Sequence, residues 1–172
     1  MFEHHAKLLR VLDEAEEIIG RKKLQKIIYI AKKLSYPFSE KYNFHFYGPY
    51  SEELTLRIEE LGNLGFLNEV REKKGGYYQY RYSLTKQGQQ FLEQYQLEMP
   101  SMDGYIDRVN EQSSRFLELV STILYFDNLP KEQVKEKVFT LKRKQNYSEE
   151  EIEEAYTYIA ELQKETQQNS SH

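Results

Sequence analysis

The densest cluster of charged side chains that could bind a ligand is a basic run at residues 21–33. Six Lys or Arg residues occupy these thirteen positions without any Asp or Glu among them. Cations in the first turn of a helix oppose its macrodipole, so this placement costs some stability. One interpretation is a surface that contacts phosphates, through Arg21, Lys22, Lys23 and Lys26 above all. The other is ion pairing with the acidic run just before it, Asp13, Glu14, Glu16 and Glu17.

Residues 51–64 form a second candidate element for nucleic-acid contact. Ser51 follows the turn at Gly48-Pro49 and is a good helix N-cap, and the expected buried stripe is Leu54, Ile58, Leu61 and Leu64. Thr55 and Arg57 could contact DNA. The outward residues, however, include Glu52, Glu53, Glu59 and Glu60, whereas helices that read bases usually present Arg, Lys, Asn or Gln. We expect these carboxylates to limit or redirect base reading.

Residues 66–84 have the pattern of a β-hairpin around the turn Lys74-Gly75-Gly76. Pairing across that turn places Leu67 opposite Leu84 and Lys73 opposite Tyr78. Four cations on this hairpin could hold a nucleic-acid backbone or a minor groove: Arg71, Lys73, Lys74 and Arg81. Packing of tyrosines against charged residues across the strands explains the same pattern, so both interpretations stay open.

The aromatic segment at residues 47–50 is a candidate contact for another protein. Tyr47, Pro49 and Tyr50 could line a groove for a peptide or a partner. Alternatively, the segment is a turn that docks two tyrosine rings on the core. His45 lies between two phenylalanines and is expected to be structural.

Signatures of catalysis are missing from the sequence. There is no cysteine and no Gly-rich phosphate loop, and the four histidines do not have the spacing of a zinc site. No Ser, His and acidic residue can be assigned as a triad. We therefore expect a protein that is not an enzyme and that has no metal and no cofactor.

Composition predicts a water-soluble domain of ordinary size. The 172 residues are 39% hydrophobic and 30% charged, with a net charge of −4. No apolar run approaches the roughly 18 residues of a membrane span, and residues 1–5 do not resemble a signal peptide. We expect a cytoplasmic protein without membrane contact. The acidic excess lies after residue 99, so the N-terminal part is the better candidate for contact with a polyanion.

The order of the expected elements predicts an α+β fold that is mostly helical. Helices at 3–19, 21–34 and 51–64, the hairpin and a helix from Thr85 to about 96 follow the order of a winged helix-turn-helix. A short strand at 44–47 would pair with the hairpin. We expect a winged-helix domain at residues 1–98, a three-helix region at 99–166 and a disordered tail at 167–172.

The C-terminal region is expected to open with a long helix at about 103–126. Its second half, residues 116–126, is apolar on more than one side, so it is buried from two directions. Either its own domain or a second copy of the chain would cover it. The second alternative predicts a homodimer through the C-terminal helices.

Three segments resemble the YwgA-like proteins of Gram-positive bacilli: residues 20–26, residues 44–54 and residues 112–121. This resemblance covers nearly the whole chain and implies no catalytic residues. Residues 61–65 and 82–88 are more loosely similar to PadR-type winged-helix regulators, which implies DNA binding and dimerising helices. Residues 23–29 and 47–49 resemble the Panacea antitoxin domain, which implies contacts with a protein.

Two functions follow from these patterns. The first is a DNA-binding transcriptional regulator, which meets the DNA backbone through the basic helix and the hairpin cations. The second is a protein-interaction module, antitoxin-like or adaptor-like, whose winged helix does not bind DNA. The net charge and the acidic helix at 51–64 favour the second.

Overall fold

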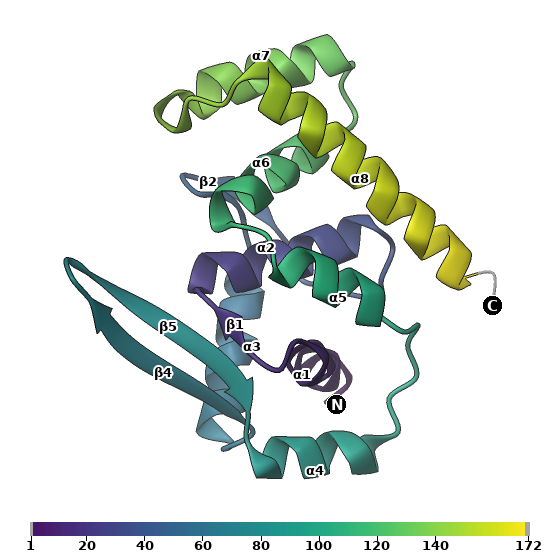
Figure 1. Ribbon diagram of the computed structural model, residues 1–172. Helices are drawn as coiled ribbons and strands as arrows, with labels where there is room; N and C mark the ends of the chain where they lie inside the picture. The colour runs from purple at the N-terminus through teal and green to yellow at the C-terminus, as the bar shows by residue number, and fades with distance from the viewer. Residues whose placement is uncertain (1, 171–172) are drawn as a thin grey trace.

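The computed structural model describes the backbone of residues 2–170 and the side chains of residues 2–166. It shows an α+β fold that is mostly helical, with a small antiparallel sheet at one side (Figure 1). Its elements are α1 (Glu3–Ala15), β1 (Ile18–Ile19), α2 (Arg21–Lys33), β2 (Asn43–His45), β3 (Gly48–Tyr50), α3 (Glu52–Asn63), β4 (Leu67–Lys74), β5 (Tyr77–Leu84), α4 (Lys86–Tyr95), α5 (Asp103–Asn110), α6 (Ser114–Tyr125), α7 (Lys131–Leu141), a 3-10 turn (Arg143–Gln145) and α8 (Glu149–Ser170).

The larger sheet has the strand order β1-β5-β4, and its β4–β5 hairpin projects from the body of the molecule (Figure 1). The predicted hairpin register is confirmed, with Leu67 opposite Leu84 and Lys73 opposite Tyr78. The third strand, β1, differs from the expectation, since the apolar spacing predicts a helix at 3–19 that includes Ile18 and Ile19. That helix ends at Ala15, Glu16 adopts a φ of 65°, and Ile18 then pairs with Tyr82. The pairing buries Ile18 completely.

The strand expected at 44–47 does not pair with the hairpin, so that prediction is wrong. Instead, β2 pairs with β3 in a separate two-stranded sheet, with His45 opposite Gly48. Gly48 has a φ of 92°, which favours glycine, and it lets the chain reverse directly after residues 46 and 47. Phe46 and Tyr47 therefore lie at the tip of a tight turn, and both are exposed.

The predicted helix starts are confirmed by side-chain caps. Ser51 accepts a hydrogen bond from the Leu54 amide, and Thr85 accepts one from the Gly88 amide. At the start of α8, Ser148 and Glu151 form the reciprocal hydrogen bonds of a capping box. One leucine predicted to face inward does not: Leu64 is 47% exposed.

The long helix expected at 103–126 is two helices, α5 and α6. The chain breaks at residues 111–113, where Ser113 caps α6 by accepting a hydrogen bond from the Phe116 amide. Every residue from Leu117 to Leu124 is buried. Since α6 packs against α2, α7, α8 and β3, its own chain covers it from several directions. This agrees with the first of the two alternatives, in which the helix is covered by its own domain.

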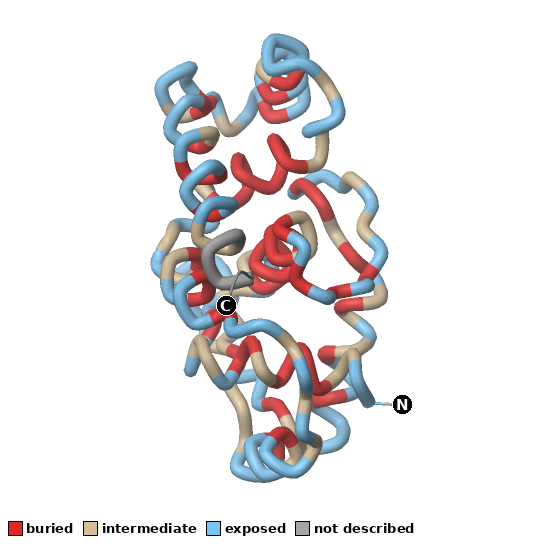
Figure 2. The backbone as a smooth tube through the Cα atoms, turned by 90° about the vertical axis from the view of Figure 1, so that its right-hand side faces the viewer, coloured by how far each residue is buried: buried red, intermediate tan, exposed pale blue. Residues whose placement is uncertain are grey.

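One hydrophobic cluster runs through both the N-terminal and the C-terminal parts of the chain. It includes Leu9 of α1, Ile27 of α2, Ile106 of α5 and Val120 of α6, and buried segments occur along the whole length of the molecule (Figure 2). Between α4 and α5, residues 97–102 form neither helix nor strand. The predicted tail at 167–172 lies outside the residues whose side chains are described.

None of the helices within residues 2–170 is both long enough and apolar enough to cross a membrane.

Gly88 should be essential to the junction between the hairpin and α4. A Cβ atom at this position would overlap the Phe66 carbonyl oxygen, whereas a Cβ atom at Gly62 would meet nothing within 4 Å. We expect Gly88→Ala to lower the free energy of unfolding by at least about 2 kcal/mol. The control Gly62→Ala, at the end of α3, should raise it by up to about 1 kcal/mol. Urea unfolding measures both; equal effects of the two variants would contradict the packing described here.

Candidate functional site

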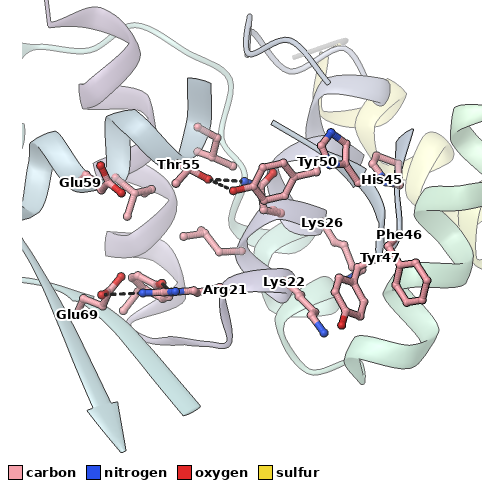
Figure 3. A pocket seen from close by; sticks show the side chains of 16 residues that line it. Arg21, Lys22, Lys26, His45, Phe46, Tyr47, Tyr50, Thr55, Glu59 and Glu69 are labelled. Carbon is pink, nitrogen blue, oxygen red and sulfur yellow. Dashed lines mark hydrogen bonds and ion pairs between the residues drawn. The ribbon is translucent and has the colours of Figure 1, made fainter. Parts of the chain in front are cut away.

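A cavity of about 550 Å³ brings together residues from both groups of predicted site residues. It lies between α2, the β2–β3 turn, residues 54–59 of α3 and the base of the β4–β5 hairpin (Figure 3). Of the predicted DNA contacts, Arg21, Lys22, Lys26 and Thr55 line it. All three predicted partner contacts line it as well: Tyr47, Pro49 and Tyr50.

Gln25 fixes the wall that α2 and α3 form together. This side chain is 6% exposed; its amide donates to the Ser51 carbonyl at 2.9 Å and to the Thr55 hydroxyl at 3.1 Å. Its amide oxygen accepts from the Ser51 amide at 2.9 Å. Thr55 also shares a hydrogen bond of 2.7 Å with the Tyr50 hydroxyl. Thr55 thus stabilises the wall. The role of Gln25 has no recognisable signal in the sequence.

Arg21 is held at the hairpin side of the cavity. Its guanidinium stacks 3.7 Å from the centre of the Tyr80 ring and donates to the Tyr82 hydroxyl at 3.3 Å. It also pairs with Glu69 at 3.4 Å (Figure 3). These contacts hold the guanidinium against the hairpin, with Glu69 as its ion-pair partner, while 58% of the side chain stays exposed.

Lys22 lies on the opposite side, where its ammonium is 3.3 Å from the centre of the Tyr47 ring. This cation–π contact joins a predicted DNA contact to a predicted partner contact. Lys22 is exposed and makes no ion pair within residues 2–166. Its charge is therefore available at the rim of the cavity.

Lys26 is the most unusual residue of the site. It is 3% exposed, and burial lowers the pKa of its ammonium to about 8, with Lys22 and Lys142 adding to the effect and Glu118 opposing it. Among the described side chains, no group accepts a hydrogen bond from its Nζ. An ammonium on a side chain this deeply buried, without a protein acceptor, is costly to keep charged.

A buried ion pair lies next to Lys26. The Lys142 ammonium is 2.9 Å from a Glu118 carboxylate oxygen and donates to the Phe46 carbonyl, also at 2.9 Å. Lys142 is 2% exposed and Glu118 is 8% exposed. Neither residue is among the site residues predicted from the sequence, although Glu118 is the only charged residue in the apolar stretch 116–126.

The remaining predicted DNA contacts lie outside the cavity, and several of them form ion pairs with acidic residues of the protein. Lys23 donates to the Asn110 carbonyl, and Lys74 pairs with Glu72 at 3.2 Å. Arg71 stacks on Tyr78, and Lys73 is exposed.

The two other arginines of this set are each bound to two acids. Arg57 pairs with Glu40, which is 1% exposed, and with Glu53 at 3.5 Å. Arg81 pairs with Glu72 at 3.2 Å and with Glu17 at 3.5 Å.

The expected pairing between the basic run and the acidic run before it is not observed within residues 2–166. Lys33 pairs instead with Asp127 at 3.0 Å, and Lys32 donates to the Glu40 carbonyl at 2.6 Å. The reason is that α1 ends at Ala15 and β1 separates the two helices, so the runs do not face each other.

The same part of the chain holds no group of three or more His, Cys, Asp or Glu residues arranged for a metal ion.

Lys26 should lower the stability of the protein at neutral pH. Its pKa falls from 10.5 in the unfolded chain to about 8 in the folded protein, so the folded state binds fewer protons between these values. Stability therefore rises with pH across this window. We expect Lys26→Met to raise the free energy of unfolding at pH 7 by up to about 3 kcal/mol, and this gain should shrink as the pH rises above 8.

Chemical unfolding at pH 7, 8, 9 and 9.5 measures this difference. Lys73→Met removes the same charge from the exposed hairpin and should stay within about 0.5 kcal/mol of the wild type. A gain that is absent at pH 7, or that stays constant with pH, would contradict the burial of a charged Lys26.

Comparison with known proteins shows the family of this chain. No family model matches the sequence. The chain is 69% identical over 162 residues to "Uncharacterized protein YwgA" of Bacillus subtilis (strain 168), and the match covers 94% of this chain and 98% of that protein. With this identity over nearly the full length of both chains, the protein belongs to the YwgA family.

Proposed function

We propose that this protein is a non-enzymatic protein-interaction module of the cytoplasm, built on a winged helix. The order α1-β1-α2-β2-β3-α3-β4-β5, with β1 paired to β5 in a three-stranded antiparallel sheet and β2–β3 inserted as a separate two-stranded sheet, supports this assignment. In the proposed winged helix, α3 takes the position of the recognition helix and the β4–β5 hairpin is the wing.

The solvent-facing side of α3 is the observation that carries the proposal. Glu52, Glu59 and Glu60 are exposed on this helix, and Leu56 between them is 57% exposed. The only arginine of α3, Arg57, turns to the buried Glu40. A helix that enters the major groove needs donors for bases and cations for phosphates, so this surface is better suited to a protein.

Exposed apolar residues on neighbouring elements support a protein partner. Leu56 lies on α3 and Val70, which is 50% exposed, lies on β4, which packs against α3. Tyr77 and Tyr78 at the wing tip are 63% and 52% exposed. Aromatic and apolar residues of this kind are enriched in the centres of protein interfaces.

A DNA-binding transcriptional regulator is the second candidate function. It is favoured by Lys22, Arg71 and Lys73, which make no ion pair within residues 2–166. These three cations, on α2 and the wing, could meet a phosphate backbone.

Photo-cross-linking in living cells separates the two functions. With a benzophenone amino acid in place of Leu56, we expect covalent adducts that a protease removes and a nuclease does not. The same amino acid at Phe139, which is 41% exposed on α7, should give none of these adducts. An adduct of twice the mass of the chain would identify the partner as a second copy.

A titration with mixed-sequence duplex DNA provides the opposing outcome. We expect no binding at low salt, and the same result for the double variant Lys22→Ala and Lys23→Ala. Binding that weakens steeply with salt and is lost in this variant would overturn the proposal in favour of DNA binding.

A further inference from the structure

The cavity beside α2 contains one cationic group without a partner. Lys26 lines the cavity, is 3% exposed and has no hydrogen-bond acceptor among the described residues. Figure 3 shows it between Lys22 and the β2–β3 turn, close to Tyr47. A ligand that supplied an acceptor here would satisfy a group that the protein itself leaves unsatisfied.

The charges around Lys26 favour a negative ligand. Behind it, Glu118 is already paired with Lys142 at 2.9 Å, so two buried cations share one buried carboxylate. At the rim, Lys22 makes no ion pair within residues 2–166. Arg21 and Glu69 offset each other at 3.4 Å. Charge balance therefore leaves room for one negative charge at Lys26.

The opposite wall of the cavity limits where that charge can lie. Glu59 lines this side and is exposed (Figure 3). A second negative charge at that end would be repelled. The cavity is thus suited to a monoanion whose charged group points to Lys26.

The other lining groups are suited to an apolar body. The lining includes the apolar side chains of Leu24, Leu54 and Ile58, and also Pro49 and Tyr50. The volume of about 550 Å³ lies in the range of sites for small molecules, which are typically apolar with a few placed polar groups.

We propose that this cavity binds a small organic anion, with an apolar or aromatic body against Leu24, Leu54 and Ile58 and a carboxylate or sulfonate at the Lys26 ammonium. This site adjoins the partner surface on α3, with which it shares Glu59, but it does not require the proposed function to be correct.

Two dyes with nearly the same body test the site. The first is 8-anilinonaphthalene-1-sulfonate, and the second is the neutral N-phenyl-1-naphthylamine, which lacks the sulfonate. The chain has no tryptophan, so protein emission does not interfere with that of the dyes. A charge-assisted hydrogen bond is worth roughly 1.5–3 kcal/mol. We therefore expect the wild type to bind the sulfonate at least about tenfold more tightly at pH 7.

Lys26→Met should remove this preference while the neutral dye binds as before. Lys73→Met, the matched control on the hairpin, should keep it. Methyl NMR of the wild type should show shifts at Leu24, Leu54 and Ile58 on addition of the sulfonate.

The pH dependence gives a second readout. The ammonium of Lys26 has a pKa of about 8, and Lys22 of the same helix, Glu118 of α6 and Lys142 after α7 are the charged groups that act on it. Affinity for the sulfonate should fall as the pH rises from 7 to 9, and it should stay constant over this range in Lys26→Met.

The proposal is overturned if both dyes bind the wild type equally, if Lys26→Met keeps the preference for the sulfonate, or if the shifted methyl groups lie away from the cavity. A failure of the α3 cross-linking experiment would leave these outcomes unchanged, so the two proposals can fail separately.

Discussion

The burial of three charged side chains where the N-terminal and C-terminal parts meet is the constraint on which the arrangement of the site depends. Glu118 of α6 and Lys142 after α7 form an ion pair, and Lys142 also donates to the Phe46 carbonyl in the β2–β3 turn. Breaking a buried pair of this kind typically costs about 3–5 kcal/mol. These contacts hold the turn that forms one wall of the cavity. The third charge is on Lys26 of α2. Its ammonium is attracted electrostatically to the same Glu118 carboxylate, but no described group accepts a hydrogen bond from it.

The elements that could be predicted from the sequence are those specified by neighbouring residues. The Gly75-Gly76 turn fixes the register of the hairpin, and Ser51 and Thr85 fix two helix starts through bonds to amides three residues away. The strand at Ile18 was missed because its partner, Tyr82, is 64 residues away. The break between α5 and α6 did have a local signal, since Ser113 is a good N-cap, but the apolar spacing on both sides suggested one continuous helix.

The site was predictable only in part, for a related reason. The sequence identified the cations, but their partners come from distant segments: Glu69 for Arg21, Glu40 for Arg57 and Asp127 for Lys33. A count of charges cannot distinguish a cation that is bound within the protein from one that is available. The position of Lys26 in the basic run predicts a phosphate contact. Its burial, which changes the interpretation, depends on α6 and the β2–β3 turn.

The distribution of charge also explains why a small anion and a nucleic acid would meet this surface differently. A duplex needs several cations at once, because its affinity comes from neutralising many phosphates. Arg21, Arg57 and Arg81 are already paired, and the exposed carboxylates of α3 repel a polyanion. A small monoanion needs only one unsatisfied cation in an apolar cavity, and Lys26 supplies it. In the proposed site, therefore, the acidic helix that disfavours DNA still permits a small monoanion, because Glu59 lies on the wall opposite Lys26 and the single negative charge can point away from it.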